Sequence, residues 1–239
     1  MTDGFPNKPR ILRGAFVEYG LSLPPLLVVF QFNPVQLTRN RSLSYTFAGA
    51  PAAAAAAQKS GAPPRTLRAE HGRRSSLLDV QREQLVTVEE QKLGFDIRLD
   101  ATDRLDEGDT VTEQFGIGPQ IATLELMTQP KRESVLGGLA ARLLQKPDGF
   151  SFTRSANPPL ILFIFGRKRV LPVNINSLNI TETEFSADLN PVRATVSVSL
   201  TVIEGSSIPY RYTQTMTEVM STVGLATAVT DAANVVVPG

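Results

Sequence analysis

Alternating apolar and polar residues predict that much of this chain forms β-strands. The clearest case is Pro191–Val202, where the even-numbered residues from Val192 are apolar and the odd-numbered residues from Arg193 are polar. Successive side chains of a strand point to opposite faces, so one face of this strand is expected to be buried. The other face is expected to meet solvent or a polar partner. Residues 93–99 show the same period, which predicts a second half-buried strand.

Further strands are expected where β-branched and aromatic residues cluster, at residues 11–19, 26–32, 37–47, 160–165 and 170–180. The strand at 26–32 is followed at once by Asn33-Pro34. Proline lacks an amide proton and holds the residue before it extended. This strand is therefore expected to end with a fixed exit direction.

Two helices are expected from spacing. Between Glu113 and Thr128 the apolar residues recur at helical intervals, and Pro119 suits a first helical turn. A terminal helix is expected after Pro209, with an apolar stripe made of Met216, Val219, Met220 and Val223. The first helix is expected to pack on the sheet.

Two long stretches lack any strand or helix period. Residues 48–64 are almost entirely alanine, glycine and proline, and the stretch that follows to Arg74 is basic. Such a composition offers little apolar area to offset the entropy of ordering. We interpret this stretch as a mobile insertion, with a short alanine helix as the lesser alternative. Residues 129–159 form a second irregular region, within which 135–144 suit a short amphipathic helix.

The expected fold class is mainly β within the α+β class: an antiparallel β-barrel or two packed sheets, with a flanking helix and a C-terminal helix. The expected organisation is an N-terminal arm at 1–10, a β domain at 11–204 and a C-terminal helical tail at 205–239. The β domain would carry irregular insertions at 48–78 and 129–159.

The composition removes several kinds of chemistry. The chain of 239 residues has no cysteine, which excludes disulfides, thiolate catalysis and cysteine-bound metals. His71 is the only histidine, and it lies in the basic aperiodic stretch, where a general base would not be held in place. We expect a surface residue, no cofactor and no metal site. A formal net charge of +1 does not favour broad capture of nucleic acid.

The N-terminus carries no apolar core of signal-peptide length, and no apolar run reaches the length of a membrane span. We therefore expect synthesis and assembly in the cytoplasm without a signal peptide or membrane insertion. The final location would be cytoplasmic or, by another export route, extracellular.

Three local motifs have both a structural and a functional interpretation. The acidic cluster between Asp100 and Asp109 fails the spacing of a calcium loop, so turn and capping carboxylates are favoured. The sequence Gly116-Ile-Gly118 begins like a dinucleotide fingerprint, but the third glycine position holds Ile121. Arg167-Lys-Arg169 follows an apolar strand, where a hairpin tip is favoured over a phosphate site.

Five blocks of sequence, in the same order, resemble the tube-protein family of contractile injection systems, which are phage-tail-like particles. The most distinctive is Phe30-Gln-Phe-Asn-Pro34, which lies within the second block. The blocks are Leu12–Val17, Val28–Arg39, Leu99–Asp103, Gly118–Leu126, and Leu162–Val173 with Ile180–Phe185 and Leu189–Val198. The resemblance is to the baseplate-associated branch of the family. Longer members of this branch add a C-terminal lysin-motif domain, for which residues 210–239 have neither the length nor the motif.

The resemblance implies a tail-tube-like fold, repeated as a ring, expected to be hexameric, around a central channel. The implied role is a non-enzymatic structural subunit at the baseplate that joins the spike hub to the inner tube. Its implied partners are other copies of itself, the spike or hub protein, the inner tube protein, and baseplate wedge or sheath subunits. Residues carried over as candidates for the fold and the assembly are Phe30, Phe32, Asn33, Pro34, Arg39, Asp100, Asp103, Arg167, Arg169, Asn190 and Pro191.

The strand pattern also allows a rival from another class, a stand-alone β-barrel module that binds a small apolar ligand. A ring-forming subunit would associate with itself, whereas a ligand barrel would stay monomeric. An enzyme is a more distant alternative, because the sequence shows no converging titratable groups.

Overall fold

The computed structural model describes residues 12–20, 25–47, 49–61, 66–130 and 157–231. The chain forms two compact units. The first comprises residues 1–39 and 92–239, and the second comprises residues 40–91. Antiparallel strands dominate the first unit, and the last element that the structure describes is a helix, which confirms the mainly β class within α+β.

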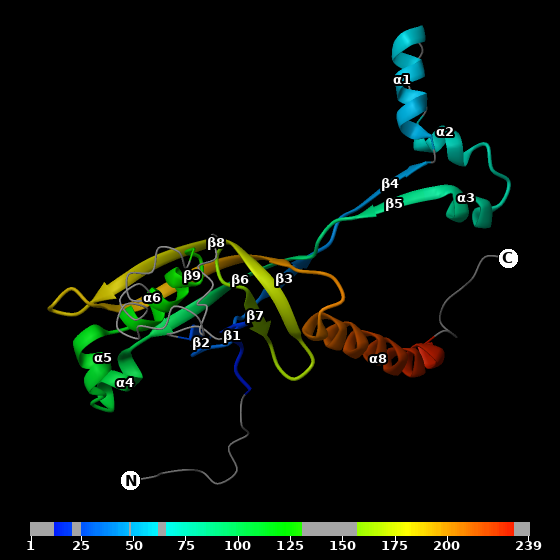
Figure 1. Cartoon of the computed structure of the whole chain (residues 1–239). Coiled ribbons are helices and arrows are strands. Elements are labelled where there is room, and N and C mark those ends of the chain that lie inside the picture. Colours follow the sequence, from blue (N-terminus) through cyan, green and yellow to red (C-terminus); the bar gives the residue numbers. More distant parts are fainter. Residues whose placement is uncertain (1–11, 21–24, 48, 62–65, 131–156, 232–239) are drawn as a thin grey trace, which may run out of the picture. The chain divides into compact units, whose positions relative to one another are not determined.

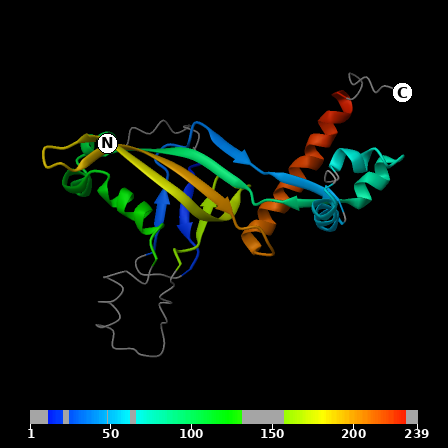
Figure 2. The same cartoon turned by 90° about the horizontal axis from the view of Figure 1, so that it is seen from above.

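The first unit is built on one seven-stranded sheet with the order β2-β1-β7-β8-β9-β6-β3 (Figures 1 and 2). The expected pair of packed sheets is therefore a single sheet here. Its strands are β1 (Ala15–Glu18), β2 (Leu27–Val29), β3 (Leu37–Asn40), β6 (Lys92–Asp100), β7 (Ile161–Ile164), β8 (Val170–Phe185) and β9 (Pro191–Val202).

Most of the expected strands are confirmed, and β9 has the predicted bounds. Val196 and Leu200 on its even-numbered face are fully buried, whereas Ser197 on the odd-numbered face is exposed. The single strand expected at 37–47 is wrong. The chain leaves the strand conformation at residues 41 and 42, so β3 ends in the large sheet and β4 (Leu43–Phe47) begins in the second unit.

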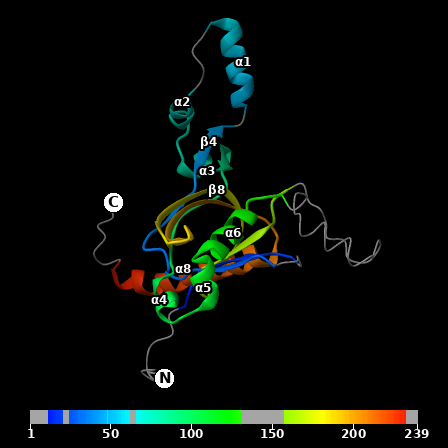
Figure 3. The same cartoon turned by 90° about the vertical axis from the view of Figure 1, so that its left-hand side faces the viewer.

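The seven-stranded sheet rolls up on itself. Its two edge strands, β2 and β3, are joined by the short segment 30–36, so they must approach each other although five strands separate them in the sheet. Viewed along the strands in Figure 3, the sheet curves around. Four phenylalanine rings fill the inside, from β1 (Phe16), the end of β2 (Phe30), β6 (Phe95) and β7 (Phe163). Every pair of these ring centroids is 5.1–6.4 Å apart.

Three helices follow β6, namely α4 (Thr102–Asp106), α5 (Thr110–Phe115) and α6 (Gly118–Leu126). The helix expected over 113–128 is therefore split, because Gly116 has a positive φ of 57° that interrupts the helical path. The predicted apolar stripe is confirmed, and it lies in the core with the strands; it consists of Ile117, Ile121, Leu124 and Met127. In Figure 3, α6 lies across the curved sheet.

The expected C-terminal helix is present as α8 (Ile208–Asp231), which packs on β8 and belongs to the first unit. The Tyr212 hydroxyl donates to the carbonyl of Arg167 at 2.7 Å. Thr213 Oγ1 accepts from the amide of Val170 at 2.9 Å and donates to its carbonyl at 2.7 Å. Residues 167–169 form the tip of the β7–β8 hairpin, as expected, with Gly166 at φ 70°.

The second unit contains a two-stranded ribbon of β4 and β5 (Gln84–Val88) and three helices. These are α1 (Ala50–Ser60), α2 (Leu67–His71) and α3 (Leu77–Glu83), which lie beyond one end of the ribbon (Figure 1). The expectation of an irregular insertion at 48–78 is wrong for these segments, and the lesser alternative of an alanine helix is correct.

Local chemistry explains these helices without any core. Alanine has the highest intrinsic helix propensity, and Gly49 and Gly61 bound α1 with positive φ angles. Thr66 Oγ1 and Ser76 Oγ accept backbone hydrogen bonds at the starts of α2 and α3. The second expected irregular region, 129–159, lies mostly outside the described residues.

The four-ring cluster generates a test of the core. Replacing Phe30, which is fully buried, by alanine should remove ring contacts to three strands and lower the free energy of unfolding by about 3–5 kcal/mol. Phe32→Ala is the matched control, because Phe32 is 45% exposed two residues later, and it should cost less than about 1 kcal/mol. Urea unfolding of both variants measures the difference. Equal losses would show that the ring cluster is not the core of the fold.

Candidate functional site

At the Asn33-Pro34 motif, the side-chain amide of Asn33 takes over the hydrogen bonds that the backbone of β2 makes to β1. The amide Nδ2 of Asn33 donates to the carbonyl of Leu12 at 2.8 Å, and the amide of Gly14 donates to Asn33 Oδ1 at 2.9 Å. The last backbone bond before it runs from the Phe30 amide to the Gly14 carbonyl at 2.8 Å. Asn33 therefore extends the ladder past the strand end, while Pro34 offers no donor to continue it.

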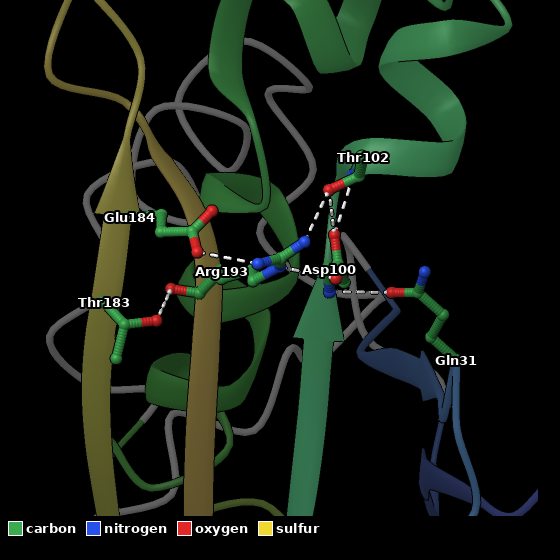
Figure 4. A network of polar contacts seen from close by, with 6 residues as sticks. All are labelled: Gln31, Asp100, Thr102, Thr183, Glu184 and Arg193. Carbon is green, nitrogen blue, oxygen red and sulfur yellow. Dashed lines mark hydrogen bonds and ion pairs between the residues drawn. The ribbon is translucent and has the colours of Figure 1, made fainter.

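A second bond ties the same segment to the other side of the rolled sheet. The backbone amide of Asp100, at the end of β6, donates to Gln31 Oε1 at 2.9 Å (Figure 4). Gln31 follows edge strand β2, whereas β6 is next to edge strand β3. This bond therefore links the two sides of the sheet close to where its edges approach.

Asp100 also anchors a polar network that joins β6, β8, β9 and the start of α4 (Figure 4). Arg193 Nε donates to Asp100 Oδ2 at 2.7 Å, and Arg193 Nη1 donates to Glu184 Oε1 at 2.7 Å. The amide and hydroxyl of Thr102 donate to Asp100 Oδ1 at 2.8 and 2.5 Å. Arg193 Nη2 donates to Thr102 Oγ1 at 3.3 Å, which completes the connection.

The network keeps both of its main partners charged. Burial alone would raise the pKa of the Asp100 carboxyl, but hydrogen bonds from Thr102 and Arg193, with the charge of Arg193, outweigh it and hold that pKa below its usual value. The hydrogen bond to Asp100 raises the pKa of Arg193, helped by the charges of Asp100 and Glu184. Such a pair is suited to holding strands together, because neither group gives up or takes a proton near neutral pH.

Asn190 and Pro191 hold the α5–α6 junction against the start of β9. Asn190 Nδ2 donates to the carbonyl of Gln114 at 2.8 Å, and the amide of Ile117 donates to the carbonyl of Pro191 at 2.9 Å. A Cβ atom on Gly116 would lie 2.0 Å from the Pro191 oxygen. Gly116 is therefore needed for close backbone approach and for its positive φ, and the Gly116-Ile-Gly118 motif has a structural use.

An open groove lies beside the network, on the outer face of β6 and β9 and next to segment 31–36. It brings together several residues that the resemblance singled out with others that it did not. Its lining includes Arg13, Gln31, Phe32, Asn33, Pro34, Val35, Asp96, Arg98, Asp100, Thr183, Arg193 and Thr195. Phe32 and Val35 are 45% and 91% exposed, so the lining combines exposed apolar side chains with polar and charged ones.

The remaining candidates lie elsewhere. Asp103 is exposed in the first turn of α4. Arg167 and Arg169 are at the β7–β8 hairpin, where the guanidinium of Arg169 lies 5.8 Å from the centroid of the Phe165 ring. Burial, and then the charge of Arg39 on β3, lowers the pKa of Arg169. The acidic residues 100–109 do act at turns and helix starts, since Thr112 donates to Asp109 at 2.5 Å as Thr102 does to Asp100.

Sequence reasoning missed the partners of these residues. The alternation of β9 places Arg193 on the polar face but does not link it to Asp100, although the two are directly opposite in the β6–β9 register. Thr102 and Glu184 lie within the resembling blocks but are not among the candidates carried over from the resemblance, and the Gly116-Ile-Gly118 motif stands out for its likeness to a dinucleotide fingerprint, not for a contact with Pro191. Gln31 lies within the Phe-Gln-Phe-Asn-Pro motif, where the flanking phenylalanines are the stronger signal.

No family model matches this chain, and no curated protein matches it. Among the described residues, no three His, Asp or Glu side chains gather as a metal site would require. None of the helices that the structure describes is both long and apolar enough to cross a bilayer.

The close approach at Gly116 gives a sharp test of the α5–α6 junction. Gly116→Ala should lower the free energy of unfolding by at least about 2 kcal/mol, because the new methyl group meets the Pro191 oxygen and φ is positive. Gly118→Ala is the control, since no atom lies within 4 Å of the position that its Cβ would take; it should stay within about 1 kcal/mol of wild type. Thermal melts of both variants measure the difference. A Gly116→Ala variant as stable as wild type would contradict the described α5–α6 junction.

The Asp100 network predicts a pH dependence. The folded pKa of Asp100 lies below its unfolded value, so its contribution is present above the unfolded pKa, about 4, and is lost as pH falls through the folded pKa. Asp100→Asn should cost on the order of 1 kcal/mol at neutral pH, since the carboxylate is partly exposed. The gap from wild type should close at low pH.

Asp96→Asn, an exposed position on the same strand, is the matched control and should leave the stability profile unchanged. Chemical denaturation between pH 7 and pH 2 provides the measurement. A constant gap between wild type and Asp100→Asn at every pH would mean that the carboxylate charge does not stabilise the network.

Proposed function

We propose that this protein is a structural subunit of a phage-tail-like contractile particle, forming a ring at the baseplate that joins the spike hub to the inner tube. The observation that carries the proposal is that candidate residues from the family resemblance make hydrogen bonds between separate elements of the fold. Asn33 and Asp100 each tie separate segments of a rolled antiparallel sheet together, and Asn190 ties the start of β9 to helix α5. Motif residues used as structural joints suit an assembly part better than an enzyme.

The sheet edges also support a ring. Strands β2 and β3 end the seven-stranded order without pairing with each other, so the backbone groups along these edges that the roll leaves open are suited to pairing with another chain. Repetition around an axis is one way to cover such edges. By family resemblance the ring is a hexamer, and its other partners are the hub, the inner tube and wedge or sheath subunits.

The polar face of β9 is our candidate for the channel lining. Its odd-numbered residues face outward from the ring cluster and pair in register with polar residues of β6 and β8. Ser197 lies between Asp96 and Asn179, and Thr195 lies between Arg98 and Thr181. A surface of hydroxyls, amides and balanced charges suits a water-filled channel.

The rival ligand-binding barrel is less well supported. Such a module needs an interior cavity for its ligand. Inside this rolled sheet, Phe16, Phe30 and Phe163 are fully buried and their rings contact one another. We therefore propose no cofactor, no catalysis and no nucleic-acid partner. We propose cytoplasmic assembly, with the finished particle retained in the cell or released.

Deletion of the gene in a producing organism tests the assignment. Electron microscopy of the deletion strain should show no particle with a spike joined to its tube, and the intact gene should restore such particles. The hydrolase, transferase and redox activities of the cell should not change. Normal spike-bearing particles in the deletion strain would overturn the proposal.

A matched pair of variants on β9 tests whether one face of the strand is buried and the other is open to the channel. Val198→Asp puts a charge on the buried face of β9 and should abolish both solubility and complementation. Ser199→Asp lies opposite Gly94 on the polar face and should leave the protein soluble and folded. Equal losses of soluble protein for the two variants would mean that both faces of β9 are buried, which would exclude the channel lining.

A further inference from the structure

The second unit has secondary structure but no core. Among its residues whose burial is described (40–47, 49, 50, 52–61 and 66–91), none is buried. An isolated two-stranded ribbon is marginally stable in water, and three or more strands or a packed helix are needed for independent stability. A unit of this kind therefore needs a surface outside itself.

The ribbon has one apolar face. In the β4–β5 register, Leu43 pairs with Val88 and Tyr45 pairs with Val86, whereas Ser44 pairs with Thr87 on the other side. The first four side chains are 45–51% exposed. We call these four residues the ribbon face.

A second, partly exposed apolar surface lies on α8, which belongs to the first unit, and at one point Lys168 Nζ donates to Met220 Sδ at 3.1 Å. Met216, Val219, Met220 and Val223 follow helical spacing on the side of the helix that carries Thr213, the residue bonded to Val170 of β8. Val219, Met220 and Val223 are 41–59% exposed. We call these four residues the α8 stripe; it continues the side by which α8 is attached.

Exposed acidic residues border the ribbon face and exposed basic residues border the α8 stripe, together with Arg41 beside the ribbon face and Glu218 beside the stripe. Glu89 and Glu90 follow the ribbon face directly and are exposed. Arg167 at the β7–β8 hairpin and Arg211 in the first turns of α8 are also exposed. Within the described part of the chain, none of these four side chains has a hydrogen bond or ion pair.

We infer that the ribbon face of one copy packs against the α8 stripe of a second copy, with Glu89 and Glu90 opposite Arg167 and Arg211. This contact joins two different surfaces, so it is heterologous, and heterologous contacts close into rings when the rotation allows. The inference deepens the proposed ring and rests on it. It assigns to the inserted unit the role of holding the neighbouring subunit.

Because the chain has no cysteine, single-cysteine variants give clean crosslinks. Val86→Cys and Val223→Cys proteins with different tags should form a mixed disulfide dimer when they are combined under mild oxidation. Thr87→Cys, on the opposite side of the ribbon, replaces Val86→Cys in the control and should give at least tenfold less mixed dimer. Both positions are exposed, so the core of the first unit should melt as in wild type.

A charge swap tests the same contact by association. Glu89→Arg with Glu90→Arg should weaken self-association at low salt at least tenfold, and Arg167→Glu with Arg211→Glu in a mixed sample should restore it. Mass photometry of each protein alone and of the mixture measures the effect.

The outcomes separate the contact from the function. Rings that form without the mixed disulfide would overturn the contact and leave the proposed function intact. Formation of Val86→Cys homodimers without the mixed dimer would show that the ribbon faces of two copies pack against each other, which would overturn the proposed contact. A disulfide within one monomeric chain of the Val86→Cys, Val223→Cys double variant would place the contact inside a subunit. A chain that stays monomeric at every concentration and is absent from particles would overturn both.

Discussion

The packing of four phenylalanine rings is the interaction on which the first unit depends. Three of the rings come from the neighbouring strands β1 and β7 and the end of β2, whereas the fourth comes from β6, which β8 and β9 separate from β7 in the hydrogen-bonded order of the sheet. Edge-to-face and offset ring contacts add to the burial of a large apolar area, so the rolled form is favoured over a flat sheet. The roll in turn lets the short segment 30–36 reach from one edge of the sheet to the other.

The polar joints are consequences of this roll. Gln31 reaches the end of β6 only because the two edges of the sheet approach each other. Asn33 completes the hydrogen bonding between β1 and β2 at the point where the chain leaves β2 and runs to β3. Asp100 and Arg193 then fix the same end of the sheet to α4. Partly exposed ion pairs contribute little to stability by themselves, so their role here is to set geometry around a core that apolar burial stabilises. The outer groove, which Gln31, Asn33, Asp100 and Arg193 help to line, follows from the positions that these joints impose.

The two units divide the chemistry of the chain between them. The first unit contains all of the described buried side chains, whereas the second consists of exposed helices and an amphipathic ribbon. An element that orders without a core is suited to recognition, because its apolar face is available to a partner. The proposed ring uses both kinds of surface: a rigid sheet for the channel and an inserted unit for the neighbour.

Local pattern alone determined much of the architecture. The strict alternation of β9, the stripe of α6 and the terminal helix follow from periods of two and 3.6 residues, which each segment carries within itself. The alanine helix is also a local property, because in that segment helix propensity outweighs the absence of a core. Only the tertiary structure decided that Phe30 is buried while Phe32 is exposed, that Arg193 meets Asp100, and that Gly116 meets Pro191. Arg193 and Asp100, like Gly116 and Pro191, are far apart in the sequence, so no local period can predict their contact. Phe30 and Phe32 are both apolar and two residues apart, so a strand period would place them on the same face. Both outcomes arise when the sheet rolls and brings distant segments into contact.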